Sequence, residues 1–242
     1  MEKRLIEELS MNAWPAFHQN LLDGWVLRFA RGFTKRSNSI TPLYHSYLDP
    51  KDKIPRCEEA YARQGLPAIF RLLDFAAPPE LDVALEKRGY RPADLTVVMV
   101  LSLARVSPSA AVVRDASLDE WMNALCFLSG TARSERQTHL ELAASIAPRA
   151  MFAVLEDRGG PLAVGLGVLQ NGFFGVFDIL THPERRRRGH GTKLVRGMLD
   201  WAGARGAGRA YLQVIANNEP ARALYRRLGF TDSHAYWYRI QS

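Results

Sequence analysis

The sequence predicts an α/β protein with a mixed, partly parallel sheet flanked by helices, built as two similar halves in tandem. Segments of strand and helix periodicity alternate along most of the 242 residues, an order typical of such sheets. A Ser-Pro step within Ser102–Pro108 marks a boundary between the halves. Leu81–Tyr90 also resembles Ala221–Phe230, because each pairs a short amphipathic helix with a Gly-aromatic end. Ordinary helix termination explains that likeness equally well.

The first half, residues 1–104, is predicted to contain three helices and four strands. Glycine or proline punctuates their ends: Gly65 stops one helix, and a Pro pair opens another. The expected helices are Leu5–Asn20, interrupted near Trp14-Pro15, Asp52–Gln64 and Pro79–Arg88. The expected strands are Gly24–Arg31, Asn38–Leu43, Ala68–Leu73 and Leu95–Leu101.

The second half, residues 105–242, alternates more regularly. Glycine-rich turns separate its central strands, and Asn218 is a good N-cap for its last helix. The expected helices are Leu118–Leu128, Ser134–Ala147, Gly189–Ala204 and Glu219–Leu228. The expected strands are Ala111–Arg114, Ala150–Leu155, Leu162–Leu169, Phe173–Leu180, Arg209–Ile215 and His234–Ile240.

Composition excludes several classes of protein. Apolar residues make up 47% and charged residues 24% of the chain, as in ordinary globular domains. Apolar runs such as Val97–Leu101 are too short to cross a membrane, and no apolar signal region follows Met1. Cys57 and Cys126 form no CxxC pair, and the six histidines show no ligand spacing. We therefore expect a cytoplasmic protein without a disulfide framework, a membrane partner or a metal.

The positive charge is concentrated in the second half. The whole chain has a net charge of +7. Residues 1–104 contain 14 basic and 13 acidic groups, whereas residues 105–242 contain 18 and 12. This asymmetry predicts an anionic ligand in the second half, and that ligand need not be a nucleic acid.

A glycine motif after a predicted strand indicates where the anion binds. Arg186 is followed by Arg187, Arg188, Gly189, His190 and Gly191, and a helix begins there. Glycines allow the backbone to approach a ligand closely, and the first turn of the helix presents free N–H groups and partial positive charge. The motif therefore predicts a pyrophosphate site, with a solvated arginine run at a surface turn as the alternative.

A second motif lies on the last predicted helix. Asn218 caps this helix, and Tyr225 follows two turns later on the same face. A phenol at this position could share a site with a ligand near the cap. A buried aromatic of the core is the alternative interpretation.

Together these motifs resemble the GNAT superfamily of acyl-CoA N-acyltransferases over about residues 110–242. The matching runs are Ile179-x-Thr181-x-Pro183-x-x-Arg186-x-x-Gly189-x-Gly191 and Asn218-x-x-Ala221-x-x-Leu224-Tyr225-x-x-x-Gly229-Phe230. The resemblance implies the GNAT fold, acetyl-CoA as donor, and a CoA site along both motifs. The implied CoA-binding residues are Ile179, Thr181, Arg186, Arg187, Arg188, Gly189, His190, Gly191, Thr192, Asn218, Ala221 and Tyr225. It also implies that Tyr225 protonates the departing thiolate.

Some positions depart from the usual family pattern. Thr181 replaces a commoner valine, and Arg187 and His190 stand where glycine and isoleucine are frequent. These changes remove no donor from the pyrophosphate site, because its donors are backbone amides.

The first half resembles the N-terminal region of a bacterial two-domain GNAT subgroup. The resemblance lies in Trp14-Pro15-Ala16, Gly24-Trp25-x-Leu27-Arg28 and the run from Gly32 to Leu43. This half has no R-x-x-G-x-G loop, and Leu85 stands at the place of Tyr225 in the internal repeat. The resemblance implies a degenerate partner domain that contributes to the acceptor site.

Polar residues around the first predicted turn are the candidates for that contribution. Among Arg28, Thr34, Arg36 and Asn38, we expect Arg36 and Asn38 to bind the acceptor. The Arg36 guanidinium suits an acceptor carboxylate, since such pairs are bidentate. A solvated turn residue is the alternative for Arg36.

The chemistry of amine acylation predicts the remaining roles. A carboxylate or water must take a proton from the amine, and Asp178 is our candidate, with Glu156 as a poorer one. A salt-bridged or solvent-facing Asp178 is the alternative. A backbone N–H in Ile179–Thr181 is expected to stabilise the oxyanion.

The sequence thus predicts an acetyl-CoA-dependent N-acetyltransferase that acts on a small-molecule amine or amino acid, as a monomer or homodimer. A non-catalytic acyl-CoA-binding sensor is one alternative. A nucleic-acid binder is less favoured, because the arginine run lacks interleaved aromatic residues.

Overall fold

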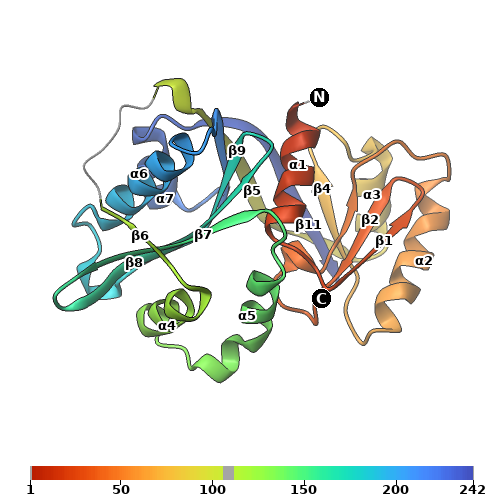
Figure 1. The fold of residues 1–242 in the computed structure, drawn as a ribbon. Coiled ribbons are helices and arrows are strands. Elements are labelled where there is room, and N and C mark those ends of the chain that lie inside the picture. The colour runs from red at the N-terminus through yellow and green to blue at the C-terminus, as the bar shows by residue number, and fades with distance from the viewer. Residues whose placement is uncertain (1, 106–111, 242) are drawn as a thin grey trace.

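One continuous sheet joins both halves of the molecule (Figure 1). The computed structural model describes residues 2–105 and 112–241. In these ranges, 11 strands form a single sheet in the order β1-β2-β3-β4-β11-β5-β10-β9-β8-β7-β6. Both types of pairing occur. Strand β3 (Ile40–Pro42) pairs parallel with β4 (Ile69–Leu73), whereas β5 (Tyr90–Ser102) pairs antiparallel with β11 (Thr231–Gln241). Strand β9 (Phe173–Thr181) also pairs parallel with β10 (Arg209–Ile215). The predicted mixed α/β class is confirmed.

The first half agrees with most of the sequence prediction. Its helices are α1 (Glu2–Ala13), α2 (Pro50–Ala62) and α3 (Pro79–Lys87), with a short 3-10 turn at Lys35–Ser37. Its strands are β1 (His18–Leu22), β2 (Trp25–Phe29), β3 (Ile40–Pro42), β4 (Ile69–Leu73) and β5 (Tyr90–Ser102).

One predicted element of this half is wrong. The helix expected to reach Asn20 ends at Ala13, and His18–Leu22 is an edge strand paired with β2. The hairpin turns at Asp23-Gly24, where both residues have positive φ. An Asp-Gly pair is the usual two-residue turn between strands, and it outweighs the helical pattern here.

The second half contains four α-helices and six strands in its described part. The helices are α4 (Leu118–Ser129), α5 (Gln137–Ala144), α6 (His190–Gly203) and α7 (Glu219–Arg227). The strands are β6 (Arg114–Ala116), β7 (Arg149–Asp157), β8 (Gly160–Gln170), β9 (Phe173–Thr181), β10 (Arg209–Ile215) and β11 (Thr231–Gln241). The predicted helix Ser134–Ala147 begins as a 3-10 turn, Arg133–Arg136, and ends at Ala144. Part of the predicted strand Ala111–Arg114 and of the boundary Ser102–Pro108 lies outside the described residues.

The two halves exchange their last strands. The series β3-α2-β4-α3-β5 has the same order as β9-α6-β10-α7-β11. Yet β5 pairs with β10 of the second half, whereas β11 pairs with β4 of the first, and β5 and β11 pair with each other. The sheet order is therefore nearly symmetric about the β5–β11 pair, which crosses the centre of Figure 1. Division at residues 104 and 105 stays a prediction.

A shared core also holds the halves together. Ile6 and Trp14 of the first half pack in one buried cluster with Trp121 and Phe177 of the second. The buried Glu7 carboxylate of α1 accepts from Arg71 of β4 at 2.5 Å and lies 2.7 Å from the His234 ring of β11. Although burial alone would raise the pKa of Glu7, Arg71 and His234 lower it to about 2. This charge pair therefore ties α1, β4 and β11 together.

Helices cover both faces of the second half (Figure 1). The strands β7, β8 and β9 contact α6 on one side and α4 on the other. No helix in the described residues has the length and apolar character needed to cross a membrane.

Candidate active site

A cavity opens where two parallel strands separate. The pairing of β9 with β10 ends at Val176 and Leu212, although both strands continue beyond it. The resulting cavity has a volume of about 240 Å³. Residues from β9, β10, α7 and the first half line it: Arg36, Val176, Phe177, Asp178, Ile179, Gln213, Val214, Ile215, Asn218, Ala221 and Tyr225.

A bulge in β9 brings Asp178 into this cavity. Phe177 pairs with Leu166 and Leu180 with Val164, so two residues of β9 face Gly165 alone. Asp178 has a φ of 50°, a conformation that non-glycine residues rarely adopt in a strand. The bulge turns this side chain toward the cavity, where 24% of it is exposed.

A histidine that the sequence analysis did not select contacts the same carboxylate. His139 of α5 places Nε2 at 2.9 Å from Asp178 Oδ2. Its ring is buried among Trp14, Phe33 and Trp121, at centroid distances of 5.3, 5.2 and 5.5 Å. Its Nδ1 atom is buried without a hydrogen-bond partner in the structure. Asp178 is thus held by a neighbour that is 39 positions away in the chain.

The glycine loop lies at the N-terminus of α6, as its sequence predicts. Gly189 is the N-cap, with φ 82°, and no side chain caps the helix there. Gly191 packs tightly, because a Cβ at this position would lie 3.1 Å from Leu224 and 3.4 Å from Thr181. Arg186, Arg187 and Arg188 are exposed. The loop therefore offers uncapped helix amides beside exposed positive charge, which is a suitable site for a phosphate group.

The last helix brings its two predicted residues to the cavity. Asn218 caps α7 by accepting from the backbone N–H of Ala221 at 3.3 Å, and Tyr225 lines the cavity two turns further on. Burial raises the pKa of the Tyr225 phenol to about 12. The phenol therefore keeps its proton near neutral pH.

Arg36 is the contribution of the first half to the cavity. Its guanidinium lies 5.9 Å from the Trp14 ring centroid and 5.8 Å from that of Phe177. Its Nε atom is buried without a hydrogen-bond partner in the structure. An anion of a ligand could occupy that donor.

Asn38 follows the turn that carries Arg36 but does not line the cavity. Its Oδ1 accepts from the backbone N–H groups of Ala30 and Gly32, and its Nδ2 donates to the carbonyls of Phe33 and Thr34. All its polar atoms are thus used within the loop that carries Arg36. Glu156 also lies elsewhere, paired with Arg114 at 3.0 Å.

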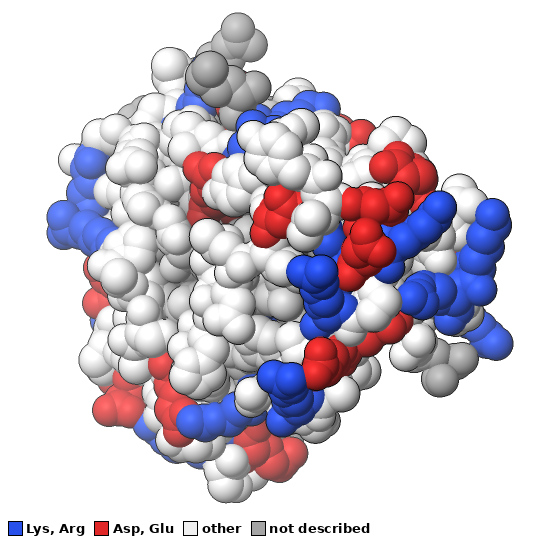
Figure 2. Space-filling view, turned by 90° about the vertical axis from the view of Figure 1, so that its right-hand side faces the viewer, with Lys and Arg blue, Asp and Glu red and all other residues white. Residues whose placement is uncertain are grey.

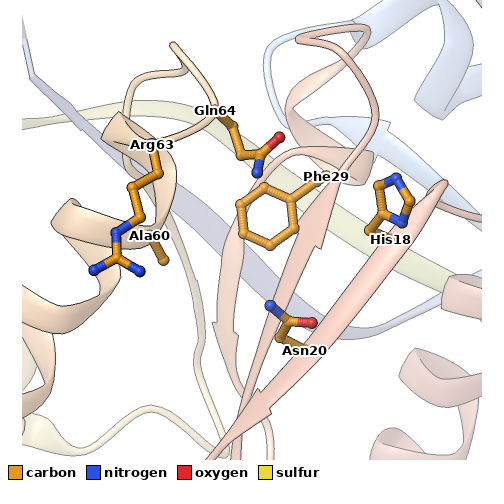
Figure 3. Close-up of a pocket in the computed structure, with 6 residues that line it drawn as sticks. All are labelled: His18, Asn20, Phe29, Ala60, Arg63 and Gln64. Carbon is orange, nitrogen blue, oxygen red and sulfur yellow. The ribbon is translucent and has the colours of Figure 1, made fainter.

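A second hollow in the first half lacks comparable chemistry. His18 and Asn20 of β1, Phe29 of β2 and the C-terminal end of α2 line it (Figure 3). None of these residues lines the cavity that holds Asp178 and Tyr225. On the face of the first half shown in Figure 2, acidic and basic side chains are interspersed, so this face has no uniform positive patch for nucleic acid.

Comparisons with known proteins relate this chain to acetyltransferases. A family model described as "Probable histone acetyltransferase Rv0428c C-terminal" matches residues 1–239. The uncharacterized N-acetyltransferase YobR of Bacillus subtilis is 28% identical, with 98% of each chain covered.

Solved structures show the same fold. A GCN5-related N-acetyltransferase from Kribbella flavida has a TM-score of 0.74 at 15% identity, covering 98% of this chain and 95% of its own. A tandem GNAT protein from the clavulanic acid biosynthesis pathway has a TM-score of 0.64 at 14% identity, with coverages of 97% and 86%.

Proposed function

Because the chain belongs to the GNAT superfamily and to its Rv0428c C-terminal family, as a tandem-domain acetyltransferase, we propose that it transfers the acetyl group of acetyl-CoA to a primary amine of a small molecule or amino acid. The observation that carries this proposal is the single cavity that brings Asp178, Tyr225 and Arg36 together. Each can serve a different part of the reaction.

The glycine loop fits the pyrophosphate of CoA. The uncapped N-terminus of α6 supplies amide donors, and Arg186, Arg187 and Arg188 supply exposed positive charge. A side chain at Gly191 would meet Leu224, so the packing of α6 against α7 at this loop depends on a glycine. We assign His190 and Thr192 to the same site, Ile179 and Thr181 to the pantetheine arm, and Asn218 and Ala221 to the adjoining wall.

Acetyl-CoA supplies the activated thioester, and two side chains move the protons. Asp178 accepts one proton from the acceptor nitrogen as the new C–N bond forms. As the C–S bond breaks, Tyr225 donates one proton to sulfur, and its raised pKa of about 12 means that the phenol holds this proton beforehand. Exchange with solvent restores both groups, so one proton passes overall from nitrogen to sulfur.

Arg36 suits an anionic group of the acceptor. Its donor is buried beside Phe177, next to the bulge that presents Asp178. A carboxylate bound there would place a nearby amine toward Asp178. Asn38 is assigned to holding the loop of Arg36 rather than to contact with the acceptor.

The test is a panel of acceptors with acetyl-CoA, read as release of free thiol. The panel includes L-alanine, L-glutamate, putrescine, tyramine and a lysine-containing peptide. Acceptor-dependent thiol release, with the acetylated amine found by mass spectrometry, is the expected result. CoA binding with only acceptor-independent hydrolysis would favour the sensor. Salt-dependent DNA binding without acetylation would favour the nucleic-acid binder.

A further inference from the structure

We propose that His139 is a positioning residue for the reaction, which fixes Asp178 in the orientation that accepts the proton of the amine. This inference rests on the proposed function. It starts from the 2.9 Å contact between His139 Nε2 and Asp178 Oδ2. Because an ionised carboxylate can only accept, Nε2 carries the proton and donates it to this bond.

The surroundings of the ring fix this tautomer. Trp14 and Trp121 present edge contacts to the imidazole at interplanar angles of 63° and 87°, and Phe33 lies against it at 33°. Nδ1 faces no acceptor in the described structure. A proton on Nδ1 would be a buried donor without a partner, which is unfavourable. The surroundings therefore favour the tautomer with its proton on Nε2, which donates to Asp178.

The same structure explains why Asp178 needs such a partner. Its backbone is in the left-handed region at the bulge, and its side chain is partly exposed to the cavity. Without the hydrogen bond from His139, rotation about the two side-chain torsions of Asp178 would turn its carboxylate away from the amine. The bond uses Oδ2, and no hydrogen bond to Oδ1 is found among the described residues. Oδ1 is therefore the oxygen left for the substrate.

Trp121 couples this arrangement to the bulge. Its indole Nε1–H donates to the carbonyl of Gly165 at 3.0 Å, and Gly165 is the residue opposite the bulge. Its ring also packs against His139. One side chain thus contacts both the strand opposite the bulge and the imidazole, which is more than filling of the core would require.

Substitutions of known geometry separate positioning from packing. His139→Phe keeps an aromatic ring among Trp14, Phe33 and Trp121 but removes the hydrogen-bond donor. We expect kcat to fall on the order of 10²-fold. His139→Gln can return an N–H near the position of Nε2 and should restore most of kcat. The KM for acetyl-CoA should change little in both, since His139 contacts neither the glycine loop nor Tyr225. Rates are measured with acetyl-CoA and the fastest amine of the panel.

A double-mutant cycle identifies the group through which His139 acts. Asp178→Asn should itself lower kcat on the order of 10²-fold or more. In that background, His139→Phe should cause no further fall, because its effect passes through the carboxylate. Full kcat in His139→Phe, or additive losses in the double variant, would overturn the proposal. So would full activity of Asp178→Asn, and in each case acetylation by the parent would leave the proposed function standing.

A measurement on the unmodified protein tests the hydrogen bond without any substrate. Long-range ¹⁵N–¹H correlation of the full chain at pH 7.5 should show a protonated Nε2 and a bare Nδ1 for His139. A protonated Nδ1 would contradict the assignment, whether or not an acceptor is found.

Discussion

The buried Arg28 guanidinium donates to the main-chain carbonyl of Arg36 at 2.9 Å. It also donates to the carbonyls of Met11 and Trp14. One side chain of β2 therefore fastens the end of α1 to the turn that carries Arg36. The position of Arg36 in the cavity depends on a residue that does not line it.

This relationship predicts a combined loss of stability and acceptor binding. Arg28→Met keeps much of the apolar stem but leaves three carbonyls without their donor, so the free energy of unfolding should fall by about 2–4 kcal/mol. Urea denaturation measures this change, and the KM for a carboxylate-bearing acceptor should rise. The exposed Arg31, paired with Glu141, provides the control Arg31→Met, which should change stability little. Equal stability of the two variants would refute the anchoring role.

Substitutions in the glycine loop should abolish CoA binding without unfolding the protein. Gly189→Val forces a β-branched side chain into φ 82°, and Gly191→Val places a Cβ 3.1 Å from Leu224. Calorimetry should then detect no CoA binding, while circular dichroism stays that of the parent. Gly203 of the same helix has open space around it, so Gly203→Ala should bind CoA normally. Unchanged affinity in a folded Gly191→Val variant would contradict the assignment of the loop.

One chain should bind one CoA. In the first half, the loop between β3 and α2 corresponds in order to the glycine loop, but the Asp23 carboxylate already accepts from the backbone N–H groups of Tyr47 and Leu48. The hydrogen bond from the Leu48 backbone N–H lowers the pKa of the Asp23 carboxyl far below its usual range, although burial opposes this shift. The carboxylate therefore stays charged. Titration calorimetry should give one site per chain, and two equivalent sites would argue against a degenerate first half.

Loss of Arg36 should affect the acceptor and not the donor. Arg36→Ala should raise the KM for a carboxylate-bearing acceptor by an amount equivalent to about 1.5–3 kcal/mol. Arg36→Lys keeps the charge but not the bidentate fork and should recover only part of that loss. Acetyl-CoA affinity should stay constant in both. A best acceptor without any anionic group, or an unchanged KM, would refute this role.

Local signals explain how much of the fold the sequence predicts. Proline and glycine mark both ends of α3 and α7, and β10 has the bounds that its apolar pattern indicates. The exchange of β5 and β11 has no local signal, because it depends on which strand each one meets after the chain has folded. The hairpin turn Asp23-Gly24 did carry a signal, which the helical pattern before it obscured.

The site shows the same division between local and tertiary information. The glycine loop and the spacing of Asn218 and Tyr225 are properties of single helices, and the cavity contains both of these α7 residues. The bulge at Asp178 arises from register with β8, and His139 reaches it only after α5 docks. The sequence does not distinguish the two roles of Asn38, because an amide can form the hydrogen bonds of a turn as well as those of a ligand site.

The central claim is that this cavity transfers an acetyl group with Tyr225 as the acid, and one measurement tests it most directly. Burial raises the pKa of this phenol to about 12, so it remains protonated well above neutral pH, and its loss should have the same effect between about pH 7 and 9. In steady-state assays with acetyl-CoA and the fastest amine, Tyr225→Phe should lower kcat on the order of 10²-fold, with little change in the KM for acetyl-CoA. Tyr211→Phe, at a buried tyrosine that does not line the cavity, should retain the parental rate. Equal kcat in Tyr225→Phe and the parent would contradict the account and leave Tyr225 as an aromatic of the core.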